Sequence, residues 1–133
     1  MDDITAVIKE VVAYSSQLTT WALAVLGVTV ATIISTSYTR PIDQKFRLAN
    51  LLFIPGWIFL SFSIYHGEQI TRKYLAAIMV KPELIPKLAS DINDLFSDQR
   101  LCFLVSLMFF GVWLFVFLLQ WVFVNSISGS KTK

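Results

Sequence analysis

The sequence predicts an all-α integral membrane protein with three transmembrane helices, and three observations support this fold class. Apolar stretches occupy residues 18–37, 48–66 and 101–124, and they contain no Asp, Glu, Lys or Arg. Each is close to the ~20 residues that a helix needs to cross the ~30 Å hydrocarbon core of a bilayer. Hydrophobic residues make up 56% of the chain and charged residues 15%, with a mean hydropathy of +0.66. Most helices of a soluble domain present a polar face to water, so we expect one membrane domain over residues 1–133.

Residues 1–17 are predicted to form an amphipathic helix, because apolar side chains recur there at helical spacing. The segment leads into the first span, residues 18–37, without a Pro or Gly break. Because it is partly acidic and no small-residue cleavage site follows, we expect no cleaved signal peptide and a first span that stays in the protein. The apolar stripe consists of Ile4, Val7, Ile8, Val11 and Val12.

Small residues recur along the first span at intervals of three or four positions. This spacing puts them on one face, where small side chains let two helix backbones approach closely in lipid. We expect this small-residue stripe to be the main helix contact of the fold. Its partner is either the second or third span of the same chain or the first span of another chain. The stripe consists of Ser16, Thr20, Ala24, Gly27, Ala31 and Ser35.

A second, weaker line on the first span carries hydroxyl groups and lies on roughly the opposite side. It consists of Ala22, Thr29, Thr32 and Thr36. The three threonines could line a polar pathway. The competing interpretation, which we favour, is that each threonine bonds a carbonyl of its own helix and packs as a small residue.

The second span, residues 48–66, follows a short basic loop at residues 38–47 and is expected to extend as a helix to about residue 80. Pro55 removes a backbone N–H near the middle of this span and crowds the Leu51 carbonyl, so a kink is expected at Pro55-Gly56. One hypothesis is that this kink acts as a gating hinge. The competing interpretation, which we favour, is that the pair has no gating role, because Pro and Gly are common in membrane helices.

Residues 83–98 are predicted to form another amphipathic helix. With the N-terminal helix and the extension of the second span, it lies on one side of the membrane, which we name face X; the opposite side is face Y. The three apolar stripes either pack on one another as a helical cap or lie flat in the headgroup region. Their polar faces carry both signs of charge, unlike the basic faces that bind anionic lipid, which favours the cap.

The third span, residues 101–124, is rich in Phe and Trp around its circumference, which indicates a helix that faces lipid over much of its surface. Asn50 and Gln120 are the strongest polar groups within the spans, and both lie near face Y. We predict an interhelical hydrogen bond between them, an Asn50–Gln120 clasp. Residues 125–133 form a polar basic tail.

The basic residues favour one orientation of the spans. Face Y carries five Lys and Arg against one Asp, and three of its basic residues lie in the short loop at residues 38–47. Face X carries six Lys and Arg against eight Asp and Glu. Basic residues in short loops mark the cytoplasmic side, so we predict a cytoplasmic C-terminus and an N-terminus outside, in a bacterial inner or plasma membrane.

The spans lack the groups that most membrane chemistry requires. Proton relays and coupled transporters need ionisable side chains within the spans, and none of Asp, Glu, Lys, Arg or His lies deep in them. His66 lies at the edge of the second span, and Cys102 is the single cysteine. We therefore expect no enzyme activity, no metal site, no cofactor and, with a net charge of +2, no nucleic-acid partner.

These observations predict a small membrane protein that works through helix association, as a homo-oligomer or as a subunit of a larger membrane complex. Its expected partners are the lipid bilayer and a second copy or another membrane protein. The first alternative is an oligomeric ion or small-solute channel in which the first span lines the pore. The second is an immunity protein against a pore-forming toxin, a class that this chain resembles in its three-span layout alone.

Overall fold

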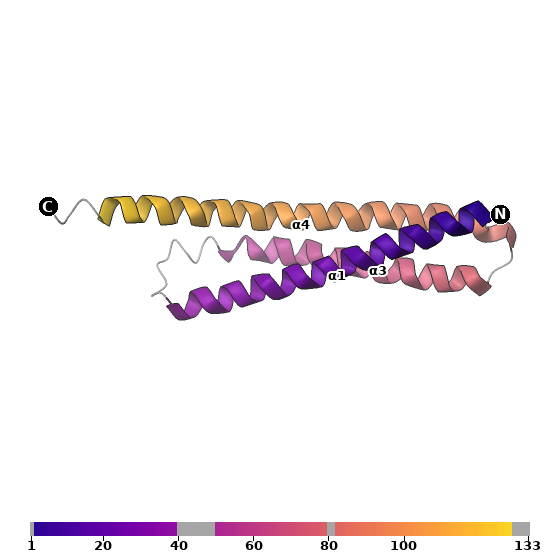
Figure 1. Ribbon diagram of the computed structural model, residues 1–133, viewed down its shortest axis with the longest axis horizontal. Coiled ribbons are helices and arrows are strands. Elements are labelled where there is room, and N and C mark those ends of the chain that lie inside the picture. Colours follow the sequence, from indigo (N-terminus) through magenta and orange to yellow (C-terminus); the bar gives the residue numbers. More distant parts are fainter. Residues whose placement is uncertain (1, 40–49, 80–81, 129–133) are drawn as a thin grey trace.

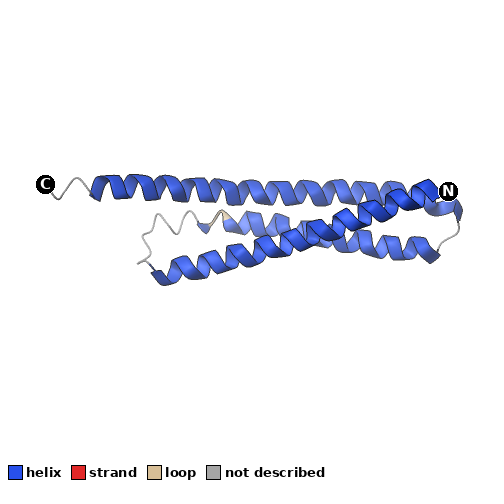
Figure 2. Ribbon diagram, viewed as in Figure 1, coloured by secondary structure: helices blue, strands red, loops and turns tan. Residues whose placement is uncertain are grey.

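The computed structural model describes residues 2–39, 50–79 and 82–128, and within them the fold is all-helical (Figure 2). Helix α1 runs over Asp2–Thr39, α3 over Phe53–Met79 and α4 over Ile85–Ser128, with a short 3-10 turn, η1, at Pro82–Leu84 before α4. The 38 residues of α1 and the 44 of α4 give helices of about 57 and 66 Å. Both are therefore about twice as long as the hydrocarbon core of a bilayer is thick.

The three helices lie side by side with α3 antiparallel to the other two (Figure 1). Helices α1 and α4 start at the same end of the molecule, where their first turns are neighbours. From there α1 crosses α3 and diverges from α4 toward Thr39. Consequently α3 packs along α4 over most of its length, whereas much of α1 has only one neighbour.

A seven-residue repeat selects the buried positions of all three helices. In α1 the buried residues are Ile8, Ser15, Ala22 and Thr29, each seven positions after the last. The same interval separates buried residues of α4, and α3 alternates steps of three and four. A seven-residue repeat keeps one seam of each helix facing its neighbours, as in coiled coils. The buried residues of α3 are Phe53, Gly56, Leu60, Ser63, Gly67 and Ile70, and those of α4 include Ile92, Gln99, Ser106 and Trp113.

The core has two separate apolar clusters. At the end where α1 and α4 begin, Ile8, Ile70 and Ile92 pack together with half-buried residues of the three amphipathic stripes. We call this part the cap cluster. The predicted stripes therefore do pack on one another, as the cap interpretation requires. The second cluster is centred on Ala22, Phe53, Leu60, Phe110 and Trp113, and we call it the aromatic cluster.

The aromatic cluster adds an inner face to the third span, which was predicted to face lipid over much of its surface. The Trp113 ring lies 4.6 Å from that of Phe53, between ring centroids, and the Phe110 ring lies 5.7 Å from it. Phe110 and Trp113 are buried, whereas Phe115 on the other side of α4 is exposed. The inner aromatic residues of α4 therefore make the core, and only the outer ones face away from it.

Residues Asp2–Thr39 form one continuous helix, α1, which agrees with the lack of a Pro or Gly break before the first span. The predicted amphipathic helix at residues 83–98 continues into the third span within α4. Helices α1 and α4 are long and apolar enough to cross a membrane. The apolar part of α3 is shorter, because the described helix begins at Phe53, and the first residues of the predicted second span lie outside the described residues.

Candidate functional site

A buried polar layer separates the cap cluster from the aromatic cluster. At its centre is Gln99 of α4, whose side chain is fully buried. The Ser15 hydroxyl donates to Gln99 Oε1 at 2.7 Å. Gln99 Nε2 donates to the Ser15 carbonyl and to Thr19 Oγ1, both at 3.1 Å. Both amide hydrogens and the amide oxygen of Gln99 are thus bonded to α1.

Helix α3 completes this layer through Ser63 and Gly67. The Ser63 hydroxyl donates to the Gln99 carbonyl at 3.0 Å. A methyl group at Gly67 would lie 2.4 Å from Thr19 Oγ1 and 2.6 Å from Gln99 Nε2, so only glycine leaves room for the network. The layer joins all three helices, and each of its amide and hydroxyl donors has an acceptor. A satisfied network of this kind stabilises the packing of the helices.

Sequence reasoning missed this layer, although a signal for it exists. Gln99 lies between Asp98 and Arg100, and these charged neighbours indicate an exposed hydrophilic segment before the third span. Yet Gln99 is seven positions after Ile92, and Ser15 is seven after Ile8. A polar residue at a core position of two seven-residue repeats indicates a buried polar contact.

The small-residue stripe of α1 faces away from its own bundle. All six positions are exposed, and a methyl group added at Gly27 would meet no atom within 4 Å. The contact with α3 and α4 is made instead by the line that includes Ala22 and Thr29. The stripe therefore lies on the side of α1 that faces away from α3 and α4 in the described bundle. Its members are Ser16, Thr20, Ala24, Gly27, Ala31 and Ser35.

Two threonines of the predicted polar pathway, Thr29 and Thr32, have described side chains. Thr29 is only 8% exposed; its Oγ1 donates to the Leu26 carbonyl at 2.9 Å and accepts from Trp57 Nε1 at 2.9 Å. Thr32 Oγ1 donates to the Val28 carbonyl at 2.8 Å. The side chain of Thr36 lies outside the described residues. Thr29 thus joins α1 to α3, and both threonines also bond carbonyls of their own helix.

Asn50 has a described partner on α4. Its Oδ1 accepts a hydrogen bond from Trp113 Nε1 at 3.3 Å. The side chain of Gln120, its predicted partner in the clasp, lies outside the described residues.

Pro55 and Gly56 lie in the first turn of α3 and not in the middle of a helix. A first turn tolerates proline, because an N–H there has no partner within the helix. The Leu51 carbonyl, which Pro55 leaves without its usual donor, accepts from the Ile54 N–H at 3.2 Å. Gly56 lies under Phe110, whose ring would be only 2.4 Å from an added methyl group. Pro55 therefore lies at the start of a helix, and Gly56 leaves space for the Phe110 ring.

Charged groups lie at the cap end. Lys73 Nζ bonds Asp91 Oδ2 at 2.9 Å between α3 and α4, and Arg72 bonds Glu68 at 2.7 Å within α3. The hydrogen bond and charge of Lys73 lower the pKa of Asp91, and those of Glu68 raise the pKa of Arg72. The side chains are 67% and 60% exposed in the Arg72–Glu68 pair and 35% and 43% exposed in the Lys73–Asp91 pair, so solvent reaches both ion pairs.

Reactive groups do not gather in the described part of the chain. No group of three or more His, Cys, Asp or Glu side chains that could hold a metal occurs there. Among the described residues, His66 Nδ1 is a buried nitrogen without a hydrogen-bond partner, and its ring meets that of Tyr65 edge-on at 5.8 Å.

Comparison with known proteins adds no relative. No protein-family model, curated protein or solved structure matches this chain.

Proposed function

We propose that this chain is a non-enzymatic membrane protein with three spans, which associates with another membrane helix through the small-residue stripe of α1. Only 11% and 17% of the apolar windows of α1 and α4 are buried inside the bundle. In water, each large apolar side chain left exposed forgoes about 1.5–3 kcal/mol of burial. A bilayer removes that loss. The exposed side chains include Val28, Ile34, Ile58, Phe62, Met108 and Phe115.

We propose that the polar layer at Gln99 lies near the boundary of the membrane. On one side of the layer lie the cap cluster and the two surface ion pairs. On the other side lie the aromatic cluster and outer faces formed by apolar residues. Trp21 and Tyr65 are exposed near this level, where amphipathic rings favour the bilayer interface. We place the cap outside the cell and the C-terminus in the cytoplasm, following the basic residues.

The single observation that carries the proposed association is the outward direction of the stripe. Helices in lipid gain little from hydrophobic contact, because lipid tails are as apolar as leucine. They associate where small residues allow close backbone contact, and the stripe around Gly27 has open space in front of it. The partner is a helix of a second copy or of another membrane protein.

The channel alternative is not supported by this arrangement. A pore lined by the first span needs its threonines to face the axis of a ring. Thr29 instead packs against α3, and its hydroxyl oxygen is bonded to Trp57 and Leu26.

The test is the mass of the purified complex in lipid nanodiscs. The chain alone has a mass of 15.1 kDa, and we expect the wild type to exceed one chain, either as a multiple of this mass or with a co-purifying partner. Gly27→Leu should reduce the complex to single chains, because the leucine side chain would keep a partner helix from approaching α1 closely. The bundle of the same chain has space for this side chain, so its fold should not change. Gly111→Leu is the matched control, since a methyl group there also meets no atom within 4 Å, and it should leave the mass unchanged. A wild type that is a monodisperse single chain would contradict the proposal.

A further inference from the structure

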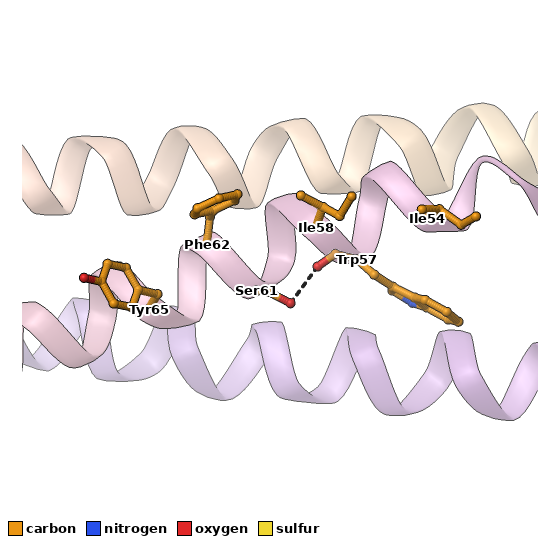
Figure 3. A pocket seen from close by; sticks show the side chains of 6 residues that line it. All are labelled: Ile54, Trp57, Ile58, Ser61, Phe62 and Tyr65. Carbon is orange, nitrogen blue, oxygen red and sulfur yellow. Dashed lines mark hydrogen bonds between the residues drawn. The ribbon is translucent and has the colours of Figure 1, made fainter.

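An apolar groove runs along the outer face of α3 beside the aromatic cluster (Figure 3). Its volume is about 530 Å³, within the range of small-molecule sites. Its four largest exposed side chains are each more than half exposed, so the rest of the described bundle leaves the groove open. It is lined by Ile54, Trp57, Ile58, Ser61, Phe62 and Tyr65.

The hydrogen-bond donors in the middle of this groove already have partners. Trp57 Nε1 donates to Thr29 Oγ1, and Ser61 Oγ donates to the Trp57 carbonyl, both at 2.9 Å. The Ser61 bond is drawn in Figure 3. Between Ile54 and Phe62 the groove thus offers no donor that needs an acceptor, and the group that fits there is a hydrocarbon.

The length of the groove matches one leaflet of a bilayer. Tyr65 follows Ile54 by eleven positions, which is about 16 Å along a helix. Half of the hydrocarbon core measures about 15 Å. With α3 crossing the bilayer as proposed above, the groove extends from near the middle of the span, at Ile54, to the face X interface at Tyr65.

Both signs of charge lie beyond the interfacial end of the groove. Glu68 and Arg72 follow Tyr65 by three and seven positions, so all three residues lie on one side of α3. The two charged side chains form an ion pair at 2.7 Å and remain 60% and 67% exposed. A headgroup with a phosphate and an ammonium group has charges complementary to this pair, with the phosphate toward Arg72 and the ammonium toward Glu68. The pair has no net charge, so it does not favour an anionic lipid.

We propose that this groove binds one acyl chain of a phosphatidylethanolamine-type lipid from the face X leaflet, with its headgroup at Glu68 and Arg72. This proposal rests on the proposed function, because it requires α3 to lie in the bilayer.

The test uses the full chain in nanodiscs that contain phosphatidylethanolamine with a photoreactive acyl chain. After irradiation, mass spectrometry of peptides locates the adducts. We expect several-fold more adducts on the Ile54–Tyr65 segment than on the exposed α4 residues Leu114, Phe115 and Leu118. Equal labelling of the two helices would mean that the lipid merely surrounds the protein, which would overturn the proposal.

Variants at Ser61 distinguish lipid binding in the groove from non-specific contact between lipid and the exposed side chains of α3. Ser61→Phe places a ring in the groove and should remove the excess labelling of α3. Gly111→Phe adds the same ring where α4 has open space and should not. Ser61→Leu, with a smaller side chain, replaces Ser61→Phe if circular dichroism shows that the phenylalanine variant is unfolded. An excess that survives filling of the groove would overturn the proposal.

The headgroup is tested with a photoreactive phosphatidylglycerol that carries the same acyl chains. We expect its excess labelling of α3 to be several-fold lower, and the difference to vanish in the Glu68→Gln, Arg72→Gln double variant. Equal excess from both lipids in the wild type would overturn the assigned headgroup.

The mass of the complex separates this proposal from the proposed function. Ser61→Phe should leave the mass unchanged, because the association surface is on α1. If instead the wild-type segment takes up no lipid and Ser61→Phe reduces the mass, a second copy occupies the groove and the lipid proposal is overturned.

Discussion

At the scale of single residues, the Gln99 side chain joins α4 to α1 through hydrogen bonds that no apolar side chain can replace. Gln99→Leu would leave the buried Ser15 hydroxyl without its acceptor and Thr19 Oγ1 without its amide donor, which costs about 2 kcal/mol of unfolding free energy. Thermal unfolding in detergent, followed by circular dichroism, measures this loss. Ser106→Ala is the control, because the buried Ser106 hydroxyl donates only to Phe103 of its own helix and its loss should cost less than about 1 kcal/mol. Equal losses for both variants would refute the role of the polar layer.

Two glycines of α3 lie where the neighbouring helices leave no space for a larger side chain. Gly56→Ala would drive a methyl group into the Phe110 ring, and Gly67→Ala would drive one into Thr19 and Gln99. Overpacking of this kind costs about 1–3 kcal/mol. Gly111→Ala, in open space, should instead stabilise its helix by about 0.5–1 kcal/mol. Chemical denaturation of the three variants gives the sign of each change, and a stabilising Gly56→Ala would contradict the close packing of Gly56 against Phe110.

At the scale of elements, the cap cluster makes the first turns of α1 and α4 part of the fold and not loose extensions. Ile92→Ala removes a fully buried side chain at the centre of this cluster and should cost about 3 kcal/mol. Leu84→Ala, at an exposed position next to α4, should cost about 0.5 kcal/mol or less. Hydrogen exchange of the amides in the N-terminal part of α1 reports the same difference locally. If the two variants exchange alike, the stripes do not form a cap.

The Lys73–Asp91 ion pair is an element-scale contact whose effect depends on pH. Lys73 lowers the pKa of Asp91, so the pair adds stability when the carboxylate is ionised. That contribution is complete above the ordinary Asp pKa of 3.8 and is lost as the pH falls through the lower folded value. Melting temperatures of wild type and Asp91→Asn should therefore differ slightly at pH 7 and converge in acid. A difference that grows as the pH falls would contradict this assignment.

Hydrophobic periodicity predicted the helices and the stripes that meet in the cap, because those features depend on local sequence. It did not identify the inner face of α1, since the line with Gly27 and the line with Thr29 both carry small or hydroxyl side chains. The difference between them lies in the residues opposite. Trp57 and Gln99 provide polar contacts for the Thr29 side, and they approach it only in the folded bundle.

At the scale of the whole molecule, one bundle extends from a charged cap into an apolar half, and the polar layer marks the change. The helices run through this boundary without a break, so the packing of the cap cluster helps to position their apolar halves. The long α4 provides the axis, α3 packs along it, and α1 crosses with one face turned outward. That outward face is the surface through which we propose that the chain associates.

The most direct test of this account is the accessibility of single cysteines to a membrane-impermeant maleimide in intact vesicles with face X outside. In a Cys102→Ser background, Asn93→Cys in the cap should react readily, whereas Phe62→Cys on α3 and Met108→Cys on α4 should react only after the vesicles are dissolved and the protein is denatured. All three positions are exposed on the bundle, so only the bilayer can shield the last two. Rapid labelling of Phe62→Cys or Met108→Cys in intact vesicles would contradict a bundle that crosses the membrane below the Gln99 layer.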